Sequence, residues 1–267
     1  MIRDQMAGGL HYLVADTLLQ VPHCFSTRLG GVSGGIYAAL NLGLHRGDEA
    51  AHVRENYQRL GRAVGFVPAQ SVFTHQVHAD QVLQVGRRDW GTGLERTQQA
   101  DCDALITDEP GTALVCFSAD CTPILLYDPV HRAIAAVHSG WRGTALGIVQ
   151  KTVEAMGRAF GTSPAHLRAA IGPCISRCCF ETDYDVPSAM IRALGDAGAQ
   201  AVEQNGMGKY HVDLKALNRA WLLQAGLRDE AIDISPLCTA CRPDLCWSHR
   251  RVGNARGSMA AVIALPG

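Results

Sequence analysis

The residues best suited to chemistry in this sequence gather around Asp120, Cys121 and His138. Asp120 and Cys121 precede one apolar run, Ile124 to Tyr127, and His138 follows the next, Ala133 to Val137. Short apolar runs bounded by turn residues indicate buried strands. A thiol and an imidazole at the ends of adjacent strands can ligate a soft or borderline metal, or form a nucleophile and base pair.

His78, in the short segment Gln-Val-His, offers a third ligand. Three ligands from separate segments (His78, Cys121 and His138) leave open the fourth position that a catalytic zinc ion keeps for water or substrate. Copper is possible at the same ligands. Without a metal, Cys121 and His138 remain a candidate nucleophile and base. His75 competes as a ligand only if the chain turns before His78, because a strand would point the two to opposite faces.

A second group of metal-ligand types lies near the C-terminus, in the pattern Cys238-x2-Cys241-x4-Cys246-x2-His249. Its residue types suit a structural zinc knuckle, although all four ligands fall within twelve residues and a second knuckle is lacking. The sequence leaves this site open. Most of the other cysteines stand in apolar, strand-like runs and are predicted to be buried thiols.

Two segments are candidates for binding an anion. The turn from Gly140 to Gly143 precedes a helix predicted over residues 144–160, and the N–H groups at a helix start favour an anion. Arg142 would add a charge-assisted contact. Arg28 precedes a glycine-rich loop, where glycines allow the backbone to approach a ligand, although a plain surface loop explains the same pattern.

Periodicity and turn residues predict the remaining elements. The predicted helices cover residues 49–64, 187–194 and 210–226, the last with Asp213 as its N-cap. The predicted strands lie within residues 11–14, 71–85, 101–107, 167–171, 232–237 and 259–265, and residues 86–99 are predicted to form an exposed loop.

Length and charge bound the function. The 267 residues show no linker, low-complexity segment or repeat, which indicates one domain over 1–267. A net charge of -1 gives no electrostatic reason to bind nucleic acid or an anionic membrane, so we expect a small-molecule partner. No apolar run approaches the ~20 residues that span a bilayer, and the first residues lack a signal-peptide pattern. We therefore expect a cytoplasmic protein.

Several motifs together resemble one known family: FSTRLGGVSGG, NLGLHRGD, QVH, SADCTPILLYDP, AAVHSGWRGTALGI and AIGPCI. From about Phe25 to Val262 the chain resembles the laccase-domain, or multicopper polyphenol oxidase, family. Its bacterial members are described as zinc purine nucleoside phosphorylases, and some as peptidoglycan editing factors. The resemblance implies an α/β (α+β) fold, a four-layer α/β/β/α sandwich with mixed β-sheets, and a zinc ion held by His78, Cys121 and His138.

The same resemblance implies a reaction. It is phosphorolysis of adenosine, inosine, guanosine and methylthioadenosine, with adenosine deamination as a second activity, in a monomer or homodimer. Purine nucleosides and phosphate are then the partners, with Arg28, Gly140, Arg142 and Gly143 at the phosphate. Cys121 would serve catalysis as well as the metal, and we expect His45 and Asp120 to transfer protons or orient ligands. The role of Arg256 is open, because its turn departs from the Thr-Gly-Arg of the family.

Three other hypotheses stay open. One is a cysteine hydrolase of peptidoglycan precursors, with Cys121 as nucleophile and His138 as base. Another is a noncatalytic nucleoside-binding protein. The third, a copper-dependent polyphenol oxidase, is disfavoured because clusters that reduce oxygen commonly use His-x-His pairs, and the 11 histidines here contain none.

Overall fold

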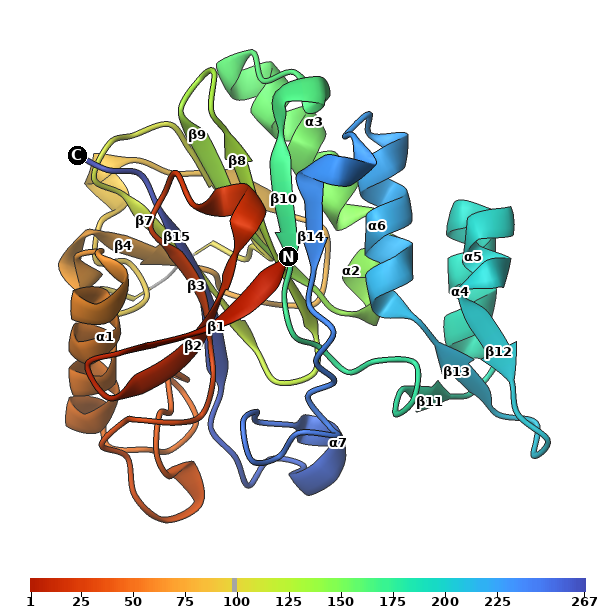
Figure 1. Ribbon diagram of the computed structural model, residues 1–267, viewed down its shortest axis with the longest axis horizontal. Helices are drawn as coiled ribbons and strands as arrows, with labels where there is room; N and C mark the ends of the chain where they lie inside the picture. Colours follow the sequence, from red (N-terminus) through yellow and green to blue (C-terminus); the bar gives the residue numbers. More distant parts are fainter. Residues whose placement is uncertain (98–99) are drawn as a thin grey trace.

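Two mixed sheets form the centre of the molecule in the computed structural model, which describes residues 1–97 and 100–267 (Figure 1). The first six-stranded sheet has the order β1 (Ile2–Ala7), β2 (Leu10–Ala15), β3 (His23–Ser26), β15 (Met259–Ala264), β7 (Ala113–Ser118), β4 (Ser71–Phe73). The second has the order β14 (Ile232–Ile234), β10 (Arg168–Ile171), β8 (Thr122–Asp128), β9 (Ala133–Ser139), β6 (Ala104–Thr107), β5 (Val82–Gln84).

Helices cover the outer faces of both sheets. The α-helices are α1 (Ala50–Val64), α2 (Trp141–Ala145), α3 (Ile148–Phe160), α4 (Asp185–Leu194), α5 (Asp196–Gln200), α6 (Leu214–Gln224) and α7 (His249–Val252). Short 3-10 helices lie at Asp16–Leu18, Gly35–Tyr37, Pro68–Gln70, Arg87–Asp89, Pro164–His166 and Asp229–Ala231. None of the helices in the described part of the chain has the length and apolarity to span a membrane.

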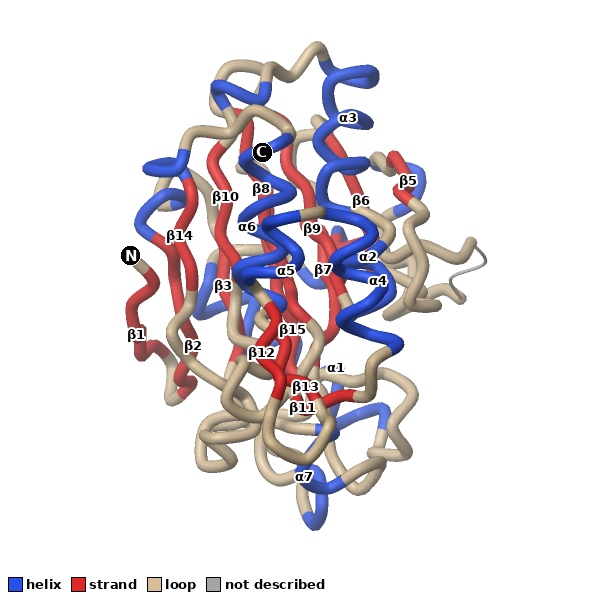
Figure 2. The backbone as a smooth tube through the Cα atoms, turned by 90° about the vertical axis from the view of Figure 1, so that its right-hand side faces the viewer, coloured by secondary structure: helices blue, strands red, loops and turns tan. Residues whose placement is uncertain are grey.

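The layers follow from where apolar side chains face. Residues of both sheets, such as Leu114 and Leu125, share one buried cluster between them. A second cluster joins α1 to the first sheet, and a third joins α3 and α6 to the second sheet. Figure 2 shows α3 and α6 lying over the strands of the second sheet. The predicted four-layer α/β/β/α sandwich with mixed sheets is therefore confirmed.

A smaller unit extends from this sandwich. The strands β11 (Glu181–Thr182), β13 (Tyr210–Val212) and β12 (Val202–Gln204) form a third, antiparallel sheet. It packs with α4, α5 and the start of α6 around its own apolar cluster (Figure 1). This unit lies next to the site described below, because its cluster includes Ile175 and Phe180.

Most predicted elements are confirmed, and two need correction. The helix predicted over 144–160 is two helices, because Gly147 adopts a left-handed conformation (φ 71°) between α2 and α3. The helix predicted over 210–226 begins only at Leu214, where Asp213 caps it by accepting from the N–H of Ala216, and residues 210–212 form β13 instead. Of the predicted loop 86–99, residues 98–99 lie outside the described residues.

A short link between the two sheets is the part of the fold that matters most for the site. Strand β7 ends in the first sheet at Ser118, and β8 begins in the second sheet at Thr122. Only residues 119–121 connect them, and the hydroxyl of Ser118 closes the turn by donating to the carbonyl oxygen of Cys121 at 2.5 Å. Asp120 and Cys121 are therefore held at the edge between the sheets.

Candidate metal centre and the adjoining cavity

The structure brings the three predicted metal ligands together. Strands β8 and β9 pair antiparallel with Pro123 opposite His138, so Cys121 and His138 lie at the same end of the pair. His78 joins them from the segment between β4 and β5. The ligand atoms of the three residues all lie within 4.8 Å of one another, and Sγ of Cys121 is 3.9 Å from Nε2 of His78.

Asp103 holds two of these ligands in place. Its carboxylate lies 2.7 Å from Nδ1 of His138, so that nitrogen carries the proton and Nε2 is free to face a metal. The same carboxylate accepts from the backbone N–H groups of Val77, His78 and Ala79. Burial favours its neutral form, but the hydrogen bonds from His138 and these N–H groups outweigh burial and lower the pKa of Asp103.

Backbone conformation also marks this centre. His78 and Asp120 both have positive φ values, 61° and 101°, which are uncommon for residues other than glycine and cluster at functional sites. Gly140 supplies space, since a Cβ there would lie 3.1 Å from Sγ of Cys121 and 3.1 Å from Cδ2 of His78. Two imidazoles and one thiolate, oriented by a buried carboxylate, suit zinc.

The thiol and imidazole are coupled electrostatically. Burial opposes ionisation of Cys121, but His138 and then His78 outweigh it and lower the pKa of the thiol to about 6. Burial likewise opposes protonation of His138, but Cys121 and Asp103 raise its pKa to about 9. The metal-free pair is thus thiolate and imidazolium at neutral pH. A bound metal would take the place of the proton on Nε2 of His138, and the positive charge of the metal would then face the thiolate of Cys121.

Asp120 lies beside the metal ligands with its carboxylate fully engaged. Oδ1 accepts from Thr239 Oγ1 at 2.5 Å, and Oδ2 accepts from Ser248 Oγ at 3.1 Å and from the N–H of Arg250 at 2.7 Å. The side chain is therefore built to anchor the 239–250 segment beside Cys121. Of the two predicted roles, this geometry favours orientation over proton transfer.

A cavity of about 310 Å³ opens beside His78 and Cys121. It is lined by His78, Ala119, Asp120, Cys121, Ile175, Phe180, His249, Arg250, Asn254 and Arg256. Burial and the neighbouring charge of Arg46 lower the pKa of Arg256 to about 10. The Nε atoms of Arg46 and Arg256 are buried, and neither has a hydrogen-bond partner among the described residues. Two adjacent guanidinium groups with unused donors favour an anion.

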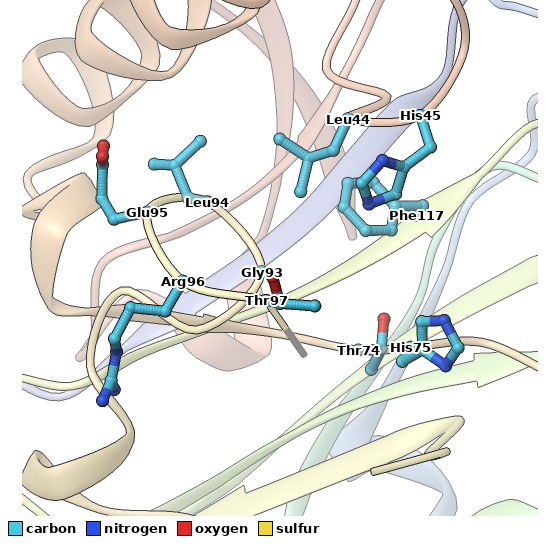
Figure 3. A pocket seen from close by; sticks show the side chains of 10 residues that line it. All are labelled: Leu44, His45, Thr74, His75, Gly93, Leu94, Glu95, Arg96, Thr97 and Phe117. Atoms are coloured by element: carbon cyan, nitrogen blue, oxygen red, sulfur yellow. The ribbon is translucent and has the colours of Figure 1, made fainter. Parts of the chain in front are cut away.

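Other residues predicted for the site lie elsewhere. His45 and His75 line a separate cavity, together with the loop that carries Glu95 and Arg96 (Figure 3). Arg28 donates to the carbonyl oxygens of Pro243 and Ala38, and its guanidinium lies 3.8 Å from the ring centroid of Trp247. These contacts join loops and give Arg28 a structural use, while its predicted anion contact stays a prediction.

The predicted helix start is present but short. Gly140 is the N-cap of α2, which has five residues, and Gly143 is buried within it. Arg142 is exposed, and its guanidinium stacks on the ring of Trp141 at 4.3 Å. The arginines that line the cavity beside Cys121 are Arg250 and Arg256 instead.

The predicted knuckle of Cys238, Cys241, Cys246 and His249 is not assembled. Cys246 packs in a buried cluster with Trp247 and Met259, and His249 lines the cavity beside the metal centre. Cys238 and Cys241 instead lie against Cys178 and Cys179.

Sequence reasoning missed Asp103, Phe180 and Arg250 as site residues. Asp103 had a usable signal, because it directly precedes the apolar run Ala104–Ile106, and a charged side chain at the entry of a buried strand must find a partner. Phe180 and Arg250 gave no comparable signal. Each reaches the cavity from a segment more than fifty residues away from Cys121 in the sequence.

Comparison with known proteins agrees with the fold and the motifs. Residues 22–266 match the family model described as multi-copper polyphenol oxidoreductase laccase. The chain is 41% identical over 260 residues to a purine nucleoside phosphorylase of Deinococcus radiodurans, with 97% of this chain and 95% of that protein covered. It is 35% identical over 258 residues to one of Bacteroides thetaiotaomicron, with 96% of each chain covered.

A solved structure shows the same arrangement. The crystal structure of YlmD from Geobacillus stearothermophilus superposes with a TM-score of 0.93 at 34% identity, and 98% of each chain is covered. The match to the family model and the identity over nearly the whole chain lead to one conclusion: this protein belongs to the multi-copper polyphenol oxidoreductase laccase family, among whose relatives are proteins named purine nucleoside phosphorylase.

Proposed function

We propose that this protein is a zinc-dependent purine nucleoside phosphorylase that acts on adenosine, inosine, guanosine and methylthioadenosine. The observation that carries the proposal is a three-ligand metal centre opening onto a cavity that two arginines also line. The names of the relatives support the same reaction. The size of the cavity, about 310 Å³, lies at the lower end of the range for small-molecule sites.

Arg256 is our candidate for the main phosphate-binding residue, with Arg250 beside it. A buried guanidinium with an unused Nε donor gains most from an ionised acceptor, and phosphate can accept two parallel hydrogen bonds from it. Arg46 adds positive charge next to Arg256. Phosphate bound there would lie inside the cavity that His78 and Cys121 line.

The apolar side of the cavity suits the purine base. Phe180 and Ile175 line it, and stacking of a base on an aromatic ring stabilises binding by about 1–3 kcal/mol. In phosphorolysis a phosphate oxygen bonds to C1′ of the ribose while the C1′–N9 bond breaks. The electron pair of the broken bond leaves with the base on N9. The base then takes up a proton, for which His249 in the cavity wall is the candidate donor.

The metal ligands complete the site. Zinc held by His78, Cys121 and His138 would supply a Lewis acid with a fourth position open to substrate or water. Asp103 keeps Nε2 of His138 directed toward that centre, and Asp120 keeps Arg250 beside it. Adenosine deamination is the second reaction we propose, because an open zinc position can activate the water that displaces ammonia.

Base release from inosine and adenosine, measured with and without phosphate and alongside metal content, tests the proposal. We expect phosphate-dependent release of hypoxanthine or adenine, and loss of turnover with the metal in His78→Ala. His75→Ala is the matched control, because His75 is exposed, pairs with Asp101 and lines the other cavity. Ammonia release from adenosine without phosphate tests the deaminase reaction. Full phosphorolysis by metal-free His78→Ala would rule out a catalytic zinc ion.

Arg256→Gln tests the phosphate site separately. We expect the KM for phosphate to rise about 10-fold or more, since a charged hydrogen bond contributes about 1.5–3 kcal/mol. Arg158→Gln removes a charge from an exposed pair on α3 and serves as the control. An unchanged KM for phosphate in Arg256→Gln would place the anion elsewhere.

One observation favours a second candidate function, a cysteine hydrolase that edits peptidoglycan precursors. The lowered pKa of Cys121 beside His138 is what a nucleophilic thiolate requires. A covalent adduct on Cys121 with an electrophilic substrate analogue, in protein that holds no metal as purified, would support this function. Stoichiometric zinc on the same thiolate would argue against it.

A further inference from the structure

Four cysteines from two distant segments meet on the far side of the cavity wall. Cys178 and Cys179 follow β10, and Cys238 and Cys241 follow β14. Their sulfur atoms all lie within 4.8 Å of one another. Sγ of Cys241 is 3.6 Å from that of Cys178 and 3.3 Å from that of Cys179, while the Cys178 and Cys179 sulfurs are 3.8 Å apart.

These distances match the edges of a metal-centred tetrahedron. Zinc bonds thiolate sulfur at about 2.3 Å, so four sulfurs at tetrahedral angles stand about 3.8 Å apart. The three distances among Cys178, Cys179 and Cys241 lie within about 0.5 Å of that edge, and the sulfur of Cys238 lies within 4.8 Å of each of them, so small side-chain shifts reach that geometry. Four sulfur ligands in a tetrahedron are typical of zinc or iron–sulfur centres, and zinc is the common ion of closed, structural sites.

The backbone around Cys238 is arranged to hold a thiolate. The N–H of Ser176 donates to Sγ of Cys238 at 3.3 Å. Burial opposes ionisation, but this N–H and those of Cys241 and Ala240 help to lower the pKa of Cys238 to about 7. The ammonium group of Lys215 lies close by, donating to the hydroxyl of Ser176 and to the carbonyl oxygen of Leu237. Hydrogen bonds from backbone N–H groups to ligand atoms typically orient and tune metal sites.

Without a cation, most of these sulfurs keep their protons. Burial and the adjacent Cys241 thiol raise the pKa of Cys178 to about 11, and burial and the same neighbour also raise the pKa of Cys179. Ionising several of these sulfurs therefore needs a cation between them. All four cysteines are free of disulfides in the structure, so each can offer a thiolate.

We propose that Cys178, Cys179, Cys238 and Cys241 bind a structural zinc ion, separate from the centre at Cys121. Four protein ligands close the coordination sphere, so the ion would not meet substrate. Its effect is mechanical, because it joins the segment after β10 to the segment after β14. Those segments already meet at the bridge between Cys174 and Cys238, through a hydrogen bond from Thr239 N–H to the carbonyl oxygen of Cys174, and through Lys215, which bonds to both Ser176 and Leu237. The ion would add a direct metal–sulfur cross-link to these weaker contacts.

The joined segments carry the cavity wall. Phe180 directly follows Cys179, and Arg250 donates from its guanidinium to the carbonyl oxygen of Cys179 at 2.9 Å. Thr239, between Cys238 and Cys241, donates to Asp120. The four cysteines are positioning residues in this proposal, since they act through Phe180, Arg250 and Asp120.

Metal analysis tests the site without relying on turnover. In a His78→Ala, Cys121→Ala background, which removes two ligands of the other centre, we expect about one zinc ion per chain after purification without added metal. Adding Cys178→Ser and Cys241→Ser should remove that ion. Both residues are exposed, so serine is tolerated sterically, and circular dichroism verifies the fold. Cys246→Ala is the matched control. This variant should keep the zinc ion if Cys178, Cys179, Cys238 and Cys241 bind it, and should lose the ion if Cys238, Cys241, Cys246 and His249 bind it.

Two further measurements make the outcome decisive. Cobalt substituted into the background variant should show the strong thiolate-to-metal absorption of four sulfur ligands, and the serine variants should lose it. Hydrogen exchange at residues 174–180 and 237–242 should accelerate when the ion is removed. A background variant that holds no zinc, or a Cys179–Cys241 disulfide found in unreduced peptides of protein purified anaerobically, would overturn the proposal. The result is independent of the phosphorylase assay.

Discussion

Gly140→Ala is the sharpest test of the metal centre, because the backbone permits alanine there while the space does not. Gly140 has φ −68° and ψ 172°, which any residue adopts. The added Cβ would lie 3.1 Å from both Sγ of Cys121 and Cδ2 of His78, whereas carbon contacts are comfortable at about 3.5–4.0 Å. The ligands must therefore retreat by about 0.4 Å or more.

A displacement of this size in the sulfur of Cys121 or the ring of His78 exceeds the variation that metal–ligand distances allow. Metal–ligand distances hold to within about 0.2 Å, so one ligand would be strained or lost. We expect zinc affinity to fall about 10–100-fold, as for the loss of a supporting residue, which corresponds to about 1.4–2.7 kcal/mol. The metal-free protein should unfold within about 1 kcal/mol of the unsubstituted chain, since replacing glycine by alanine at a permissive φ slightly stabilises.

The assay is competition for zinc with a chromogenic chelator, beside thermal unfolding of the chelator-treated protein. Gly34→Ala is the matched control, because Gly34 is extended and a Cβ there meets no atom within 4 Å. If Gly140→Ala binds zinc as tightly as the unsubstituted protein, the three ligands do not converge beside Gly140 and the reasoning fails.

Three further predictions follow from the described contacts. Asp103→Asn should weaken zinc binding about 10–100-fold in the chelator assay, because the Nδ1–H of His138 loses a carboxylate partner, whereas Asp101→Asn on the surface should leave binding unchanged. Asp48 accepts from Ser33, Asn41 and the N–H of Glu49; burial opposes this charge, but the hydrogen bonds prevail and lower the pKa of Asp48. The ionised carboxylate of Asp48 stabilises the fold above its unfolded-state pKa of about 4, and this stabilisation is lost as pH falls through its lower folded-state pKa. Asp48→Asn should therefore lower the free energy of unfolding by about 1–3 kcal/mol at pH 7, and by progressively less below pH 4, in denaturant titrations. A constant cost across that range would contradict the assignment. Arg28→Met should lower the unfolding midpoint through the lost contacts to Pro243, Ala38 and Trp247 without changing the KM for phosphate, and a large rise in that KM would restore Arg28 as an anion-binding residue.

Two of the candidate metal ligands, Cys121 and His138, were within reach of the sequence because each stands at or next to a strand end. Apolar runs located β8 and β9, and antiparallel pairing of neighbouring runs then brings Cys121 and His138 to one edge. The family resemblance selected His78 over His75, which spacing alone could not do. The structure shows why His78 can turn inward: the chain has left the strand, and His78 itself has a positive φ.

The proposed anion site was harder to predict because its residues come together only through tertiary packing. Arg28 and Arg142 stand beside glycines and looked available, but each stacks its guanidinium on a tryptophan. Trp247 is more than two hundred residues from Arg28, so no local pattern could reveal that contact. The cysteine pairs 178–179 and 238–241 were likewise joined only by folding, whereas spacing alone grouped Cys241 with Cys246 and His249, which lie elsewhere.

The three-residue link between Ser118 and Thr122 has a consequence for how this chain can vary. It is at once the crossing from one sheet to the other and the carrier of Asp120 and Cys121. A single inserted residue would displace the thiol and the carboxylate together from their places between the end of β7 and the start of β8. We expect an insertion at an exposed hairpin tip such as 205–208 to be tolerated. The same insertion at 119–121 should prevent folding and metal binding. Length, as much as residue type, is constrained at this point of the chain.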